Sequence, residues 1–101
     1  MPSPNPDPQP LTPAAGATAI PLPDLGAGGE PVRVSAWFVD PGDLVEAGDA
    51  ILEVVVPGLT CDVSSPVSGR IVRLVQEIDD LVRPGDVVAW VETALRQKSV
   101  F

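Results

Sequence analysis

Apolar residues in the middle of the sequence occur in short runs and show no helical spacing of useful length. The runs are rich in Val, Ile and Leu, and they cover residues 32–39, 50–56, 61–63, 70–75 and 87–91. Pro, Gly and Asp separate them. β-Branched residues favour strands, whereas Pro, Gly and Asp favour turns. The pattern therefore predicts an all-β domain of short strands.

An internal repeat supports this prediction. A shift of 37 residues places 43–49 (DLVEAGD) over 80–86 (DLVRPGD), with five of the seven positions identical. The apolar flanks also correspond: Val34 with Ile71, Ile51 with Val88, and Val54 with Val91. The Gly and Asp residues suit tight turns, and the Leu-Val pairs at 44–45 and 81–82 are expected to anchor those turns on the core. Two copies are too few for a solenoid, so we expect a pseudo-twofold β-sandwich or flattened barrel.

Proline content divides the chain into three parts. Eight of the 13 prolines fall within the first 23 residues. Proline removes a backbone donor, so we expect residues 1–18 to form a disordered, polyproline-type arm. Residues 19–93 form the compact unit. Residues 94–101 form a short tail, for which a frayed helical turn and disorder both remain open.

Charge and residue types exclude several functions. The chain has 14 acidic and six basic residues, a net charge of −8, which argues against nucleic acid and anionic membranes as partners. It has no His and one Cys, which excludes an internal disulfide, a zinc site of the usual kind, and Ser-His or Cys-His catalysis. The apolar runs are too short to cross a bilayer and the N-terminus lacks secretory features, so we expect a cytoplasmic protein.

Four separated segments resemble lipoyl domains of 2-oxo acid dehydrogenase acyltransferase (E2) components, and also related biotinyl domains. They are residues 20–26 (IPLPDLG), 37–45 (WFVDPGDLV), 65–69 (SPVSG) and 83–89 (RPGDVVA). The resemblance covers about residues 20–93. It implies a barrel-sandwich hybrid, a flattened β-barrel of two four-stranded sheets. It also implies a lipoyl- or biotinyl-lysine at the tip of the hairpin between the two halves.

The lysine is where this sequence departs from the family. An alignment without gaps, taken backwards from Ser65, places Gly58 at the modified lysine and Pro57 at the preceding Asp. The one lysine of the chain is Lys98, in the tail. Neither Gly nor Arg supplies the ε-amine that lipoate or biotin requires, so we expect no cofactor on the hairpin. Pro-Gly is a strong turn pair, which indicates that the hairpin keeps its shape.

Candidate interaction residues follow from this alignment. They are Pro57, Gly58, Leu59 and Thr60 at the hairpin tip, together with Trp90. Trp90 falls on Glu53 in the repeat, on a face expected to point to solvent, and both core packing and a partner contact remain open for it. Trp37 is expected to pack in the core, and Cys61 to be a small buried residue. The paired Asp79 and Asp80 are expected in a solvated turn.

We therefore expect a non-enzymatic, stand-alone, degenerate lipoyl-like domain. It would act as a binding module for components of a 2-oxo acid dehydrogenase complex or a related lipoate- or biotin-dependent complex. One alternative is a carrier subunit modified at the atypical Lys98. A second is an adaptor or assembly protein unrelated to lipoate.

Overall fold

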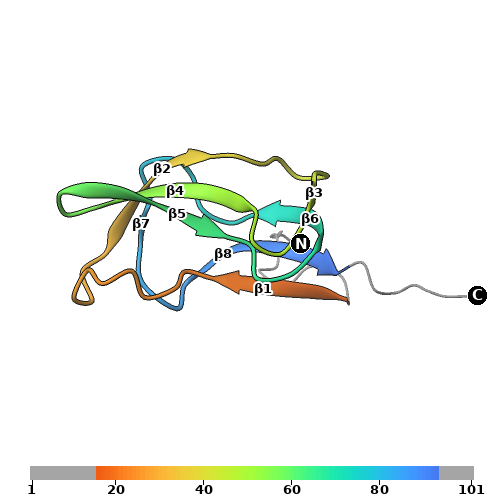
Figure 1. Cartoon of the computed structure of the whole chain (residues 1–101), viewed down its shortest axis with the longest axis horizontal. Coiled ribbons are helices and arrows are strands. Elements are labelled where there is room, and N and C mark those ends of the chain that lie inside the picture. The colour runs from red at the N-terminus through yellow and green to blue at the C-terminus, as the bar shows by residue number, and fades with distance from the viewer. Residues whose placement is uncertain (1–15, 94–101) are drawn as a thin grey trace, which may run out of the picture.

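The computed structural model describes residues 16–93, which form eight β-strands (Figure 1). The strands are β1 (Ala17–Pro21), β2 (Val32–Trp37), β3 (Leu44–Val45), β4 (Ala50–Val56), β5 (Leu59–Ser64), β6 (Gly69–Leu74), β7 (Leu81–Val82) and β8 (Val87–Thr93). No helix occurs in this range. The all-β prediction is confirmed. Most of the expected arm and the whole tail lie outside the described residues.

The strands form two four-stranded antiparallel sheets. The strand order is β1-β8-β6-β3 in sheet A and β5-β4-β2-β7 in sheet B. Each sheet takes two strands from the first half of the domain, β1 to β4, and two from the second, β5 to β8. The halves are therefore interlocked, and the expected flattened barrel of two four-stranded sheets is confirmed.

The strands reproduce the repeat seen in the sequence. Strands β2, β3 and β4 map onto β6, β7 and β8 with both ends shifted by 37 residues. A bulge interrupts the pairing of β2 between Val34 and Ala36, and an equivalent bulge interrupts that of β6 between Ile71 and Arg73. The internal pseudo-twofold symmetry is therefore a property of the backbone as well as of the sequence.

Four turns of the repeat share one construction. Each ends in an Asp whose carboxylate accepts the backbone N–H three residues earlier: Asp43 from Asp40, Asp49 from Glu46, Asp80 from Glu77, and Asp86 from Arg83, all at 2.8–2.9 Å. The residue before each Asp has positive φ: Gly42 (98°), Gly48 (97°), Asp79 (76°) and Gly85 (93°). The prediction that these Asp residues belong to tight turns is confirmed, and their carboxylates cap those turns.

The core lies between the two sheets and consists of Val, Ile, Leu and Ala side chains. The repeat-related pair Val34 and Ile71 is fully buried, as are Ile51 and Val88. Burying one such side chain contributes roughly 1.5–3 kcal/mol. Trp37 packs against this cluster, and its indole N–H donates to the carbonyl of Gln76 at 2.9 Å.

Two details differ from expectation. Strand β1 begins at Ala17, two residues inside the segment expected to be the arm, because Ala17 and Thr18 pair with Glu92 and Val91 of β8. In the two-residue strands β3 and β7, only Val45 and Val82 are buried and anchor the turn on the core. Leu44 and Leu81 are 72% and 67% exposed, because adjacent strand residues point to opposite faces.

Candidate functional site

The hairpin between β4 and β5 is the structural counterpart of the predicted interaction site. The strands pair up to Val56 and Leu59, so Pro57 and Gly58 form a two-residue turn. Gly58 has a φ of 83°, which with Pro at the preceding position matches a type II turn. The hairpin protrudes at one end of the molecule, opposite the end where β1 begins and β8 ends (Figure 1).

The hairpin tip is exposed and uncharged. Pro57, Gly58 and Thr60 are exposed, and Leu59 is 57% exposed. A Cβ atom added at Gly58 would meet no atom within 4 Å, so the tip has room for a side chain. The positive φ is the only local obstacle to one. The structure brings the four predicted tip residues together.

The described residues offer no group that could hold the family's cofactors by an amide bond. Residues 16–93 contain no lysine, and the guanidinium of arginine is not an acyl acceptor of this kind. No group of three or more Cys, Asp or Glu side chains in this range is placed to hold a metal ion. The chemistry available at the tip is therefore contact by apolar surface and by the Thr60 hydroxyl.

A row of side chains on the outer face of sheet B extends from the tip. Thr60 pairs with Val55, Val55 with Arg33, and Arg33 with Leu81 of the edge strand β7. Sequence reasoning missed Leu81 because it assigned the residue to the core. Its exposure depends on which face of β7 it occupies, and the alternation with buried Val82 was the available signal.

Trp90 lies on sheet A, and the structure does not bring it to the hairpin tip. It stands between the buried residues Ala89 and Val91 of β8, with Ala19 and Arg73 as its cross-strand partners. Trp90 is half-buried, and core packing and a partner contact both stay predictions for it. Its indole Nε1 is buried and has no hydrogen-bond acceptor among the residues that the structure describes.

The contacts of Cys61 and Glu53 are those of ordinary strand residues. Cys61 is half-buried, packs against the core and pairs with Val54. It is therefore less buried than the sequence predicted. Glu53 accepts a hydrogen bond from the hydroxyl of Ser35 at 2.8 Å, across the bulge of β2.

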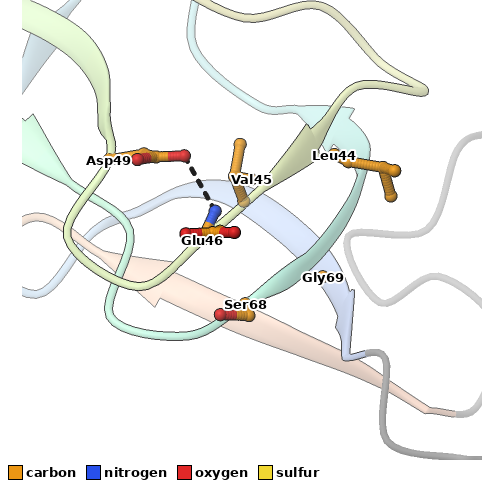
Figure 2. A pocket seen from close by; sticks show the side chains of 6 residues that line it. All are labelled: Leu44, Val45, Glu46, Asp49, Ser68 and Gly69. Carbon is orange, nitrogen blue, oxygen red and sulfur yellow. Dashed lines mark hydrogen bonds between the residues drawn. The ribbon is translucent and has the colours of Figure 1, made fainter.

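A groove beside β3 was not predicted (Figure 2). It encloses about 460 Å³, and Leu44, Val45, Glu46, Asp49, Ser68 and Gly69 line it. Two backbone contacts shape it: the N–H of Glu46 donates to Asp49 and the N–H of Ala47 donates to the Ser68 hydroxyl at 3.0 Å. The groove joins residues from both halves, so no local pattern could reveal it.

No helix within residues 16–93 is long and apolar enough to span a membrane.

Comparison with known sequences gives a consistent result. The profile of the biotin/lipoyl family described as "Biotin-requiring enzyme" matches residues 18–91. The chain is 34% identical over 87 residues to the dihydrolipoyllysine-residue acetyltransferase component of the pyruvate dehydrogenase complex of Corynebacterium glutamicum. It is 32% identical over 74 residues to the lipoamide acyltransferase component of the branched-chain alpha-keto acid dehydrogenase complex of Pseudomonas putida. These matches cover 84% and 73% of this chain but only 13% and 16% of those proteins.

Solved structures show the same fold. The lipoyl domain of the 2-oxoglutarate dehydrogenase complex from Azotobacter vinelandii has a TM-score of 0.55 and 22% identity, covering 79% of this chain and 100% of that chain. Urea carboxylase from Kluyveromyces lactis has a TM-score of 0.66 and 22% identity, covering 84% of this chain and 7% of that chain. With the matched sequence segments and the two interlocked sheets, these findings show that the chain belongs to the biotin/lipoyl family and is related to the lipoyl domains of E2 components.

Proposed function

We propose that this domain is a non-catalytic, degenerate lipoyl-like module that carries neither lipoate nor biotin on its hairpin and acts by binding protein partners. One observation carries the proposal. The two-residue tip of the β4–β5 hairpin is Pro57-Gly58, and residues 16–93 contain no lysine. Because the attachment of lipoate or biotin needs an ε-amine, a hairpin without lysine has no acceptor.

The hairpin itself is well formed, which supports a role for it. Five cross-strand pairs run without interruption from Leu52 opposite Val63 to Val56 opposite Leu59. The tip presents Leu59 and Pro57 to solvent beside the Thr60 hydroxyl. Apolar residues on a rigid protruding turn suit contact with another protein.

The relatives suggest which partners to test. Those described above are components of the pyruvate dehydrogenase and branched-chain alpha-keto acid dehydrogenase complexes. We propose that the partners are components of a 2-oxo acid dehydrogenase complex, or of a related lipoate- or biotin-dependent complex, in the cytoplasm. The net charge of −8 favours a partner with a basic surface.

Two measurements on native material test the proposal. The intact mass of the chain purified from its source cells should equal that of the polypeptide, with no lipoyl or biotinyl addition. A mass increase that maps to Lys98 would contradict the proposed binding module and favour the alternative, a carrier subunit modified at an atypical lysine.

The second measurement is affinity purification of the tagged chain, read by mass spectrometry. We expect 2-oxo acid dehydrogenase components to co-purify with it. A Leu59→Ser variant should lose them, whereas Leu44→Ser, at an even more exposed leucine at the other end of the molecule, should retain them. Recovery of unrelated partners alone would favour the adaptor alternative and end the proposal.

A further inference from the structure

The groove beside β3 combines an apolar wall with two carboxylates. Leu44 and Val45 supply the apolar wall, and Glu46 and Asp49 lie at the turn that follows (Figure 2). The Asp49 carboxylate accepts the N–H of Glu46, which holds it at the groove. An occupant with both basic and apolar side chains would complement this lining.

The strand register places the end of β8 beside the groove. Thr93, the last described residue, pairs with Gly69, and Gly69 pairs with Val45. Neighbouring strands lie about 4.8 Å apart, so Val45 is about 10 Å from Thr93. Three or four extended residues span that distance, at about 3.3 Å each. Residues that follow Thr93 are therefore within reach of the whole groove.

The next segment has the required composition. Residues 94–101 (ALRQKSVF) contain Arg96 and Lys98, two of the six basic residues of the chain, together with Leu95, Val100 and Phe101. Arg70, a cation on the neighbouring strand β6, is the cross-strand partner of Leu44 and is engaged elsewhere. Its guanidinium donates to the carbonyl of Gly42 at 2.9 Å.

The repeat provides an internal comparison. At the equivalent place beside β7, Arg83 stands where Glu46 stands, and Pro31 and Val32 stand where Ser68 and Gly69 stand. The second copy therefore has a cation at this turn and a larger side chain in place of the glycine. The acidic groove belongs only to the copy that lies next to the end of β8.

We propose that residues 94–101 occupy the β3 groove of their own chain, with Arg96 and Lys98 beside the carboxylates of Glu46 and Asp49. This contact covers the exposed edge of β3, which would otherwise be available to another strand. It also holds the one lysine of the chain at the end of the molecule opposite the hairpin tip, against an acidic surface. The inference does not depend on the proposed partners.

Paramagnetic relaxation in the full-length chain tests the proposal. A nitroxide label is placed at Ser99→Cys in a Cys61→Ala background, and amide signals are recorded at low salt. We expect the signals of Glu46, Asp49 and Ser68 to lose at least half their intensity, whereas those of Gly58 and Leu59 keep theirs. Unchanged intensities at the groove overturn the proposal.

Charge variants separate a specific contact from proximity alone. The double variant Arg96→Glu, Lys98→Glu should restore the groove signals, and the conservative double variant Arg96→Lys, Lys98→Arg should leave them broadened. Equal broadening in both variants overturns the ionic contact. In unlabelled protein with native Cys61, the same charge reversal should shift the amide resonances of residues 44–49, which guards against an effect of the label.

A mixing experiment identifies which chain supplies the segment. Spin-labelled chains without ¹⁵N are mixed with ¹⁵N chains without the label. Full signal intensity in the mixture supports docking within one chain. Broadening of the groove signals in the mixture shows that a second copy supplies the segment and overturns the intramolecular contact.

Discussion

Asp79 and Gly42 occupy equivalent positions in the two halves, and both have positive φ, 76° and 98°, although only one of them is glycine. Both backbone N–H groups donate across the barrel to repeat-related carbonyls. Asp79 bonds to Val34 at 2.8 Å, and Gly42 bonds to Ile71 at 2.7 Å. Asp79 is thus the one non-glycine residue with positive φ among the described residues, and its backbone bond holds it there.

Replacing Asp79 by glycine should stabilise the domain. The left-handed region costs a non-glycine residue about 1–2 kcal/mol, and the added flexibility of glycine in the unfolded chain offsets about 0.4–1 kcal/mol. Asp79→Gly should therefore raise the free energy of unfolding by up to about 1 kcal/mol in urea denaturation. The reverse change at the repeat-related turn, Gly42→Asp, should lower it. A loss of stability in Asp79→Gly would show that the Asp79 side chain makes a compensating contact.

Gly69 should tolerate no side chain. A Cβ atom there would overlap the carbonyl oxygen of Glu92 on the neighbouring strand, and backbone cannot move aside cheaply. Gly69→Ala should cost about 1–3 kcal/mol or more, as overpacked sites do. Gly58→Ala is the matched control, because it meets only open space and bears the cost of positive φ alone. Thermal unfolding followed by circular dichroism should show a larger loss at Gly69 than at Gly58.

The two tryptophans should respond differently to the loss of the indole N–H. Trp37 donates to the Gln76 carbonyl, so Trp37→Phe should cost about 1 kcal/mol. The buried Nε1 of Trp90 has no acceptor in residues 16–93, so Trp90→Phe should be neutral or stabilising. Denaturation followed by far-UV circular dichroism compares them directly. Equal destabilisation by both changes would reveal an acceptor for Trp90 elsewhere in the chain.

The aspartate-capped turns should each contribute measurably. Asp86 accepts the N–H of Arg83 at 2.9 Å, and its removal in Asp86→Ala should cost about 1 kcal/mol. Asp86→Asn keeps an acceptor oxygen and should cost less. A urea titration of the two variants gives the difference, and identical losses would assign the effect to the charge.

A lysine at the hairpin tip should restore an amine that can be lipoylated. The Pro57→Asp, Gly58→Lys double variant presents an amine on an exposed turn with open space around it. Incubation with a lipoate ligase, lipoate and ATP should increase the mass of this variant and leave the native chain unchanged. Ser64→Lys, also on an exposed position of β5, is the control and should stay unmodified. A folded double variant that resists modification would show that the hairpin has lost more than its lysine.

The strands were predictable because they depend on local pattern and on the repeat. Val34 and Ile71 were paired by sequence alone, and both are fully buried in equivalent strands. Leu44 was assigned to the core because its neighbour Val45 belongs there, and only the strand's alternation separates them. The groove and the surroundings of Trp90 depend on which distant strands become neighbours. Glu46 meets Ser68 and Gly69 through β3–β6 pairing, and no local rule predicts that register.

The interlocked sheets also determine when the domain can fold. Ala17 pairs with Glu92, and Val32 pairs with Val82, so each sheet joins the beginning of the domain to its end. During synthesis, β1 stays without its partner until β8 has left the ribosome. Structures dominated by such long-range pairing fold more slowly than helical bundles. Neither repeat can mature first as a separate unit, so the two copies are committed to fold together in a single cooperative step.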